Sequence, residues 1–170
     1  MAGGYGSRLY PLTYGVSKQL IPVYDKPMIY YPLSTLLIAG IKEILIITKV
    51  EDNSNFKTLL GDGKKFGITI EYAVQETPSG IAEALIIGAN FIENNNVCLI
   101  LGDNIFHGDK MKIFLREAIN NLNDGFSTIF GVKVDNPAEF GVVEFNSDNE
   151  ILSITEKPLN PNSEIIVSGL

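Results

Sequence analysis

Apolar runs of strand length alternate with helical patterns along most of this chain, and this alternation constrains the fold more than any other feature. The runs are rich in β-branched residues and bounded by Gly, Asn, Asp or Pro, which predicts strands over 44–48, 68–74, 97–101 and 127–134. Helical spacing predicts helices over 28–39, 81–92 and 111–122. Strands this apolar are typical of a sheet covered on both faces. The sequence therefore predicts an α/β fold of the Rossmann-like, doubly wound kind, with a mostly parallel sheet and helices on both faces.

A second pattern appears near the end of the chain. In "GVVEFNSDNEILSITEK", two alternating stretches flank the turn formers at 147–149, which predicts a β-hairpin. The sequence shows no internal repeat and no second domain boundary. We therefore expect one domain over residues 1–170.

Both ends of the chain interrupt this pattern. A glycine-rich loop over residues 3–8 would normally follow a central strand, yet only two residues precede it here, and the chain stops inside the apolar run "IIVSGL". We expect a chain that is truncated at both ends. Produced alone, such a chain is predicted to be inactive or poorly folded.

Charge and composition exclude several classes of partner. The chain has 13 basic and 20 acidic residues, a net charge of −7, and its basic residues are scattered, so polymeric nucleic acid is not an expected partner. No apolar run reaches the roughly 18 residues of a membrane-spanning helix. Its single cysteine, Cys98, lies in "NVCLIL" and is predicted to be packed and unreactive. No signal-peptide pattern is present, so we expect a cytoplasmic protein.

The stretch "GGYGSR" is the first candidate for chemistry. Its three glycines let backbone N–H groups close on phosphate oxygens, and Arg8 adds positive charge. A plain tight turn explains these letters equally well. Lys18 follows as a second cation that could clamp a polyphosphate, or as a solvated surface lysine.

Three further positions carry side chains that could bind a ligand and lie at the ends of predicted strands. Gln75 ends a predicted strand, and its amide suits the edge of a pyrimidine or an adenine; a buried structural glutamine is the alternative. Asp103 follows the strand of "VCLILGDN", where a carboxylate can bind Mg²⁺ shared with phosphates, or can cap a turn. Glu156 and Lys157 offer a hydroxyl acceptor beside a cation, or a surface ion pair.

Taken together, these segments resemble the sugar-phosphate nucleotidylyltransferases, and within them the branch that uses dTTP. The resemblance covers the whole chain, and its motifs follow the family's order and approximate spacing: "AGGYGSRLYPLT", "SKQLIPVYDKPMIYYPLSTLLIAGI", "LLGDG", "VQETPSGIAEALIIG", "LILGDNIFHG", "FGVVEF" and "EKP". It implies the nucleotide-diphospho-sugar transferase type of fold, with transfer of a thymidylyl group from dTTP to glucose 1-phosphate. A UTP-using enzyme of the same fold and a non-catalytic nucleotide-sugar binding fragment are the alternatives.

The resemblance also implies roles for individual residues. Arg8 and Lys18 would act on the nucleotide phosphates and Lys157 on the sugar phosphate, which makes these three the catalytic candidates. Asp103 would hold Mg²⁺, Gln75 and Gly80 would read the thymine edge, and Glu156 would accept sugar hydroxyls. The full set of expected substrate-binding residues is Gly3, Gly4, Gly6, Ser7, Gln19, Gln75, Pro78, Gly80, Asp103, Asn104, Gly141, Glu156 and Val167.

Compared with the family, the chain is shorter. The resemblance implies that a first strand and roughly the last two fifths are absent, including a second metal-binding aspartate and much of an oligomer interface. The full-length protein is expected to be a homo-oligomer, a tetramer, that serves nucleotide-sugar synthesis for cell-surface polysaccharide.

Overall fold

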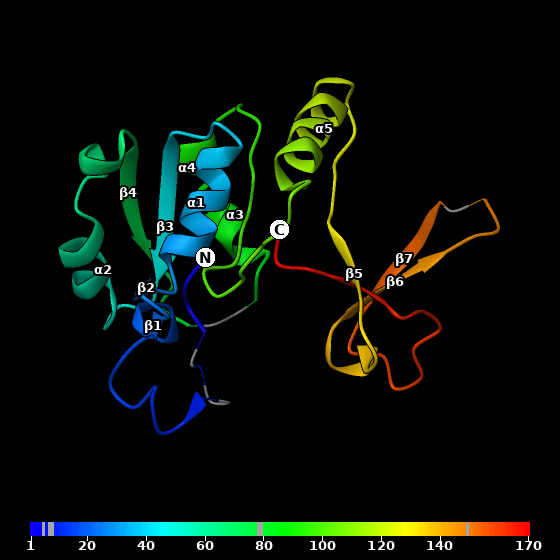
Figure 1. Cartoon of the computed structure of the whole chain (residues 1–170), viewed down its shortest axis with the longest axis horizontal. Helices are drawn as coiled ribbons and strands as arrows, with labels where there is room; N and C mark the ends of the chain where they lie inside the picture. The colour runs from blue at the N-terminus through cyan, green and yellow to red at the C-terminus, as the bar shows by residue number, and fades with distance from the viewer. Residues whose placement is uncertain (5, 7–8, 78–79, 149) are drawn as a thin grey trace. The chain divides into compact units, whose positions relative to one another are not determined.

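The computed structural model describes residues 1–4, 6, 9–77, 80–148 and 150–170. Their contacts group into two compact units, Met1–Asn120 and Asn121–Leu170, which are described separately below (Figure 1). The expectation of one domain over 1–170 stays a prediction.

In the first unit, short elements surround a small parallel sheet. In chain order the elements are η2 (Lys18–Leu20), β1 (Pro22–Val23), β2 (Lys26–Pro27), α1 (Tyr30–Ile38), β3 (Glu43–Thr48), α2 (Asn53–Leu60), η3 (Lys64–Phe66), β4 (Thr69–Val74), α3 (Glu83–Ile87) and α4 (Ala89–Ile92). Helix α5 (Met111–Asn123) follows and reaches the first residues of the second unit.

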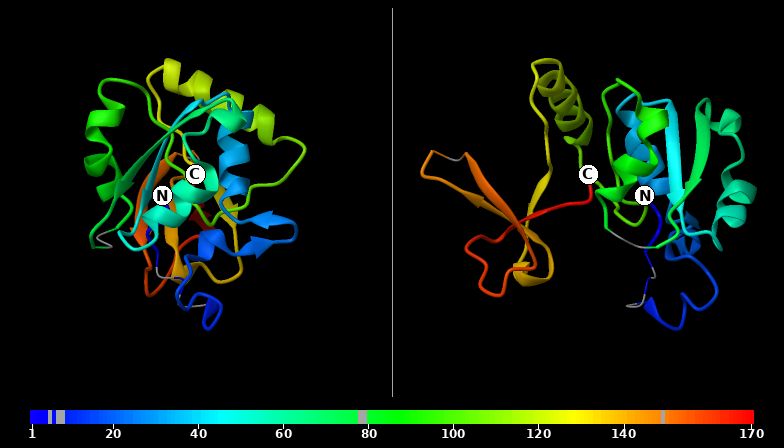
Figure 2. Two further views of the ribbon diagram at one scale, coloured as in Figure 1. Left: turned by 90° about the vertical axis from the view of Figure 1, so that its left-hand side faces the viewer. Right: turned by 180° about the vertical axis from the view of Figure 1, so that it is seen from behind.

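β3 and β4 form the sheet and pair in parallel, from Glu43 opposite Thr69 to Thr48 opposite Val74. The left view of Figure 2 shows these strands between α1 on one side and α3 and α4 on the other, as expected for a doubly wound sheet. Helix α2 packs against β4 and buries Phe56 completely. The apolar strands thus obtain the two-sided cover that their composition requires.

The second unit is built on an antiparallel sheet. Its elements are β5 (Gly131–Lys133), η4 (Pro137–Glu139), β6 (Gly141–Phe145), β7 (Ile151–Glu156) and β8 (Ile165–Val167), in the sheet order β5-β8-β6-β7. β6 and β7 form the predicted hairpin, with Gly141 opposite Glu156. At its turn, the side-chain oxygen of Asn146 accepts hydrogen bonds from the backbone N–H groups of Asp148 and Glu150.

Three predicted elements differ from the observed ones. The helix expected over 81–92 is interrupted at Gly88, where a side chain would lie 3.0 Å from the Ala84 carbonyl oxygen. The strand expected over 127–134 shortens to β5, which pairs with β8 at three positions, and backbone hydrogen bonds of Phe130 and Val134 continue the contact at its two ends. Residues 97–101 form no regular strand, since within the described ranges only Met1 pairs with them.

The apolar runs do not build a membrane-spanning element. Across the part of the chain that the structure describes, no helix combines the length and the apolarity needed to cross a bilayer.

Candidate functional site

Three parallel segments of the first unit end at the same place and bring polar residues together. The backbone N–H of Ala2 donates to the Ile47 carbonyl at 2.7 Å, and the N–H of Gly102 donates to the Met1 carbonyl at 2.7 Å. On the other side of β3, the N–H of Gln75 donates to the Thr48 carbonyl at 2.8 Å. The glycine loop, Gln75 and Asp103 therefore leave the same carboxyl edge, which is where open α/β sheets bind ligands.

Gln75 lies against the start of the glycine loop. Its side chain is 2% exposed, and a Cβ added to Gly3 would lie 2.7 Å from its Oε1. Nε2 donates to Glu83 Oε2 at 2.5 Å and to the Gly80 carbonyl at 3.3 Å. Oε1 has no hydrogen-bond partner among the described residues. The amide is thus held in place through its nitrogen while its oxygen stays available to a donor.

Lys18 and Asp103 meet in an ion pair at this edge, with side chains 22% and 25% exposed. The glycine loop lies directly beside Lys18, because a Cβ at Gly4 would lie 3.7 Å from Lys18 Cε. Gly6 has a φ of +64°, and a side chain there would lie 2.8 Å from Thr13 Cγ2. Since L-residues rarely adopt this φ, the loop needs glycine at this position to approach Lys18.

Gln19 is buried next to the segments that carry the ion pair of Lys18 and Asp103. It is 2% exposed, and its Oε1 accepts a hydrogen bond from Ser17 Oγ at 2.6 Å. Its backbone carbonyl accepts from Ile29 N–H, and its Cγ would lie 3.2 Å from a Cβ on Gly102. Gln19 therefore fixes the segments that carry Lys18 and Asp103.

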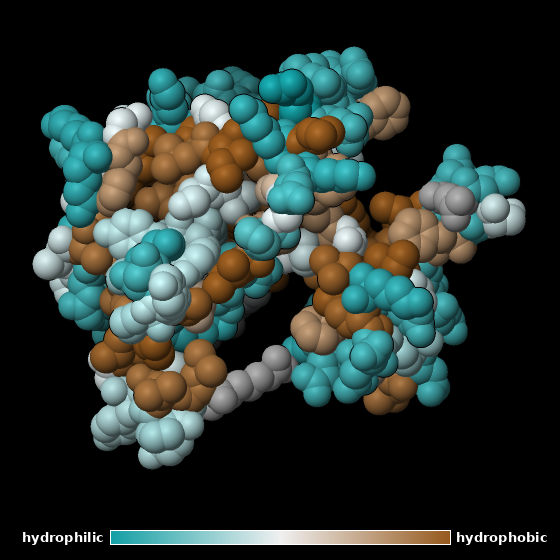
Figure 3. All heavy atoms as spheres, in the orientation of Figure 1, coloured by the Kyte–Doolittle hydropathy of each residue, from teal (hydrophilic) through white to brown (hydrophobic). Residues whose placement is uncertain are grey.

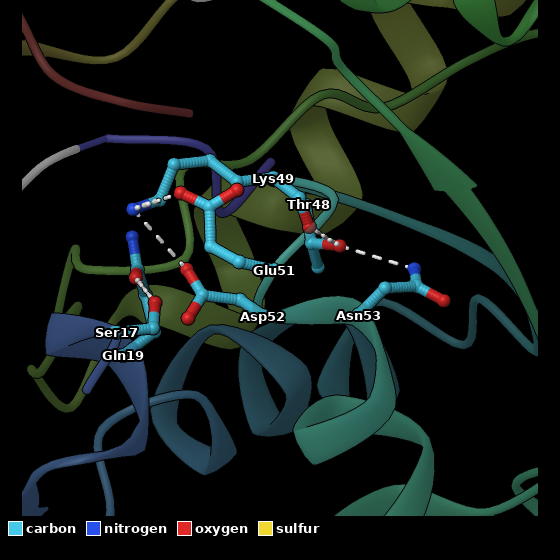
Figure 4. A network of polar contacts seen from close by, with 7 residues as sticks. All are labelled: Ser17, Gln19, Thr48, Lys49, Glu51, Asp52 and Asn53. Carbon is cyan, nitrogen blue, oxygen red and sulfur yellow. Dashed lines mark hydrogen bonds and ion pairs between the residues drawn. The ribbon is translucent and has the colours of Figure 1, made fainter. Parts of the chain in front are cut away.

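The sequence reasoning missed a polar cluster at the end of β3 (Figure 4). Lys49 Nζ lies 3.3 Å from Glu51 Oε1 and 3.4 Å from Asp52 Oδ2. Burial lowers the pKa of Lys49, the two carboxylates raise it, and the net shift is upward, so Lys49 stays charged. The letters "KVED" directly after the predicted strand were the available signal. Glu83, which holds Gln75, was also missed.

In the second unit, three of the expected substrate-binding residues come together: Gly141, Glu156 and Val167. Gly141 pairs with Glu156, and a Cβ on Gly141 would lie 3.3 Å from Glu156 Oε2 and 4.0 Å from Val167 Cγ2. Lys157 follows with a φ of +46°, and its N–H donates to the Phe140 carbonyl at 2.9 Å. Lys157 Nζ lies 3.6 Å from Glu156 Oε1, with side chains 63% and 73% exposed. A carboxylate and an ammonium thus face solvent side by side, over a glycine.

Two of the remaining predicted site residues lie in the described part of the first unit. Gly80 is exposed with a φ of +105°, and Asn104 is half-buried next to Asp103. Ser7, Arg8 and Pro78 lie outside the described residues.

The prediction that Cys98 is packed was wrong, because the residue is exposed, whereas its low reactivity stays a prediction. The reason is that no strand covers the adjacent edge of 97–101 in the described chain, although partial desolvation still raises the pKa of the thiol.

Asp103 is the residue in this edge best placed to hold a divalent cation. No group of three or more potential ligands among His, Cys, Asp and Glu occurs in the described ranges. One partly exposed carboxylate suits Mg²⁺, which takes one or two protein carboxylates and completes its shell with water and substrate phosphates.

Comparison with known proteins places the whole of this chain in one family. A family model described as nucleotidyl transferase matches residues 1–170. The chain is 58% identical over 170 residues to the glucose-1-phosphate thymidylyltransferase of Neisseria meningitidis and 51% identical to that of Mycobacterium tuberculosis, and it spans 58% of the length of each.

Solved structures agree with this. A protein from Bacillus anthracis, described as a candidate glucose-1-phosphate thymidylyltransferase in complex with sucrose, superimposes with a TM-score of 0.86 at 38% identity, covering 99% of this chain and 67% of that one. A UDP-glucose pyrophosphorylase superimposes with a TM-score of 0.80 at 24% identity, which shows likeness of fold alone. The predicted α/β fold is therefore confirmed.

Proposed function

Because this chain belongs to the nucleotidyl transferase family, we propose that its protein transfers a thymidylyl group from dTTP to glucose 1-phosphate, giving dTDP-glucose and pyrophosphate. The observation that carries the proposal is the meeting of the glycine loop, Lys18, Gln75 and Asp103 at one edge of parallel strands. Relatives at 50–58% identity that carry this name support the choice of substrates.

Gln75 is the residue proposed to recognise the base. Its Oε1 lacks a partner among the described residues, and its Nε2 is shared between Glu83 and the Gly80 carbonyl. An oxygen held in this way can accept the N3–H of thymine, and a displaced Nε2 can donate to a ring carbonyl. Burial strengthens both interactions because water does not compete for the amide.

The phosphates are proposed to lie between the glycine loop and Lys18. Backbone N–H groups near Gly4 and Gly6 and the Lys18 ammonium supply positive charge, and Arg8 is proposed to add to it. The Asp103 carboxylate fits a Mg²⁺ ion shared with the phosphates. When bound, this cation would neutralise phosphate charge at the reacting centre.

The reaction needs no protein nucleophile. An oxygen of glucose 1-phosphate attacks the α-phosphorus of dTTP in line, forming a P–O bond while the bond to the bridging oxygen breaks and pyrophosphate leaves with the electron pair. The attacking phosphate is already anionic, so the protein must position two anions that repel each other. On the sugar side, we assign Glu156 to the hydroxyls, Lys157 to the phosphate, and Gly141 and Val167 to the walls.

Several properties of the whole protein remain proposals from the sequence and its resemblance. They are cytoplasmic location, a homo-tetramer and a role in cell-surface polysaccharide synthesis. The chain spans 55–58% of the length of the curated relatives, so turnover belongs to the gene product in which these residues occur.

Calorimetric titration of the complete gene product with dTTP and Mg²⁺ tests the nucleotide site. Lys18→Met should weaken dTTP binding roughly tenfold or more, as expected for loss of a charge-assisted contact. Lys42→Met is the matched control, because Lys42 is exposed and precedes the opposite end of β3. Equal affinity of both variants would contradict the assignment of Lys18.

Pyrophosphate release by the complete gene product tests the reaction. We expect release that requires both glucose 1-phosphate and dTTP, with UTP a poor substitute. Comparable turnover of UTP would reassign the base, and nucleotide-sugar binding without turnover would favour the non-catalytic alternative.

A further inference from the structure

Glu83 lies beside the residue that we propose to recognise the base. It is half-buried, it begins α3, and its Oε2 accepts a hydrogen bond from Gln75 Nε2 at 2.5 Å. Gln75 follows β4, whose carboxyl end is its lower end in Figure 1. Figure 3 shows hydrophobic residues gathered at the surface over the opposite, upper ends of α1 and β3. The lower end therefore offers polar groups, and not that apolar surface, for recognition of a ligand.

The two ends of the Gln75 amide have opposite chemistry. Its nitrogen carries two N–H donors, whereas its oxygen only accepts hydrogen bonds. Because the two ends are nearly equal in size, a half-turn of the amide would exchange a donor for an acceptor without changing the shape of the site. The base that Gln75 can recognise thus depends on what fixes this orientation.

Both neighbours of the Gln75 nitrogen are acceptors. Besides the Glu83 carboxylate, Nε2 donates to the Gly80 carbonyl at 3.3 Å, so each of its two N–H groups has a partner. A half-turn would bring Oε1 against the same two acceptors, with no proton between them. The bond to Glu83 is shorter and charge-assisted, which makes Glu83 the stronger of the two restraints.

The oxygen of the Gln75 amide lies against the start of the glycine loop. A Cβ added to Gly3 would lie 2.7 Å from Oε1, and the Gln75 side chain is 2% exposed. Oε1 has no hydrogen-bond partner among the described residues. Since a buried acceptor without a donor is unfavourable, an N–H group of a ligand would stabilise it.

We infer that Glu83 is a positioning residue that sets base specificity through the orientation of the Gln75 amide. By holding Nε2, the carboxylate keeps Oε1 turned toward the ligand, so the site accepts a base with a ring N–H at the position that is read. Thymine and uracil carry such an N–H at N3, whereas cytosine carries a lone pair there. Glu83 thereby acts against cytosine nucleotides and does not distinguish thymine from uracil. The inference rests on the proposed function, in which Gln75 recognises the base.

The affinities of the complete gene product for dTTP and dCTP, measured by calorimetry with Mg²⁺, test this role. Glu83→Gln keeps the length of the side chain but can donate an N–H to a turned Gln75 amide. Affinity for dTTP should change by no more than about twofold, because the original orientation stays available, whereas affinity for dCTP should rise about tenfold. A merely structural role would lower both affinities together, so the rise for dCTP is the distinguishing result.

Glu76→Gln is the matched control. Glu76 is exposed and directly follows Gln75, so its loss removes the same charge from the same neighbourhood. Less repulsion of the triphosphate should change both affinities alike and leave their ratio unaltered. A ratio that falls as much in this control as in Glu83→Gln would assign the effect to charge and overturn the inference.

Glu83→Ala is a second variant, which removes the acceptor without adding a donor. It should also reduce the preference for dTTP over dCTP, and it provides the test if Glu83→Gln does not fold. An unchanged preference in the Glu83 variants overturns the inference and leaves the proposed function intact. A wild-type protein that binds dCTP as tightly as dTTP overturns both, because Gln75 would then not read the base as an acceptor.

Discussion

At Gly3, the absence of a side chain decides where the Gln75 amide can lie. A Cβ would lie 2.7 Å from Gln75 Oε1, closer than such contacts allow, so Gly3→Ala must move the amide. We expect this variant to lose about tenfold of its preference for dTTP over dCTP, because these two bases differ at the edge that an amide reads. Competitive binding of the two nucleotides measures the preference.

Gly4→Ala is the matched variant. Its Cβ would lie 3.7 Å from Lys18 Cε, which is an ordinary contact, and its φ is not in the left-handed region. It should keep the base preference even where triphosphate affinity falls. Loss of preference in both variants would show that the loop as a whole, and not the Gln75 amide, sets it.

Glu156 is the residue-scale test of the sugar site. Its carboxylate lies over Gly141 and is 73% exposed, so it is free to accept sugar hydroxyls. In the complete gene product, Glu156→Ala should raise the KM for glucose 1-phosphate about tenfold while leaving dTTP binding unchanged. Glu164→Ala removes a comparable exposed carboxylate, paired with Lys133, and should change neither. A matching rise in that control would remove Glu156 from the site.

At the scale of elements, the sequence was informative where a segment has a distinct apolar pattern. β3 and α5 match their predicted ranges within one residue, because a short continuous apolar run is typical of a buried strand and helical apolar spacing is typical of an amphipathic helix. The strand over 97–101 failed for a different reason. An apolar run shows that a segment prefers burial, but it does not show whether a neighbour is there to pair with it.

The same distinction applies to the site. Gln75 and Asp103 could be predicted to lie at one edge because each follows the carboxyl end of a parallel segment, whereas Lys18 could be placed there only through its closeness in sequence to the glycine loop. The cluster of Lys49 with Glu51 and Asp52 could not, because it depends on side-chain directions in a turn after β3. Such directions leave no periodic signal in the sequence.

The turn between α2 and β4 gives a prediction at this scale. Gly63 has a φ of +86°, and a Cβ there would lie 2.8 Å from the Ile68 carbonyl oxygen, a backbone atom that cannot rotate away as a side chain can. Gly63→Ala should lower the free energy of unfolding by about 2–4 kcal/mol, from left-handed strain and a steric clash together. Urea unfolding measures the change.

Gly67→Ala separates the two contributions. Gly67 has a φ of +71° with nothing within 4 Å of an added Cβ, so it should cost only the strain, about 1 kcal/mol. Equal losses in the two variants would mean that the clash is relieved by movement of β4.

At the scale of the whole molecule, the predicted site residues are divided between the two units. The nucleotide candidates belong to Met1–Asn120, whereas the sugar candidates belong to Asn121–Leu170. Within the first unit, Met1 and Ala2 form backbone hydrogen bonds with both β3 and residues 100–102.

The pH dependence of stability should reveal this position of Met1. In the 170-residue polypeptide, burial lowers the pKa of the Met1 amino group from 8.0 to about 6, while the nearby Asp103 carboxylate raises it. Between these values the unfolded chain binds more protons than the folded one, so stability falls as the pH drops from 8 to 6. The expected loss over this range is about 2 kcal/mol, because one pKa unit corresponds to about 1.4 kcal/mol and the group is only partly titrated at each end of the range. Urea unfolding at pH 8, 7 and 6 measures it, and the Nα-acetylated polypeptide, which keeps the N–H donor but cannot take up the proton, should lack this part of the loss. Identical pH dependence of the two forms would show that the amino group is not buried between Ile47 and Ile100.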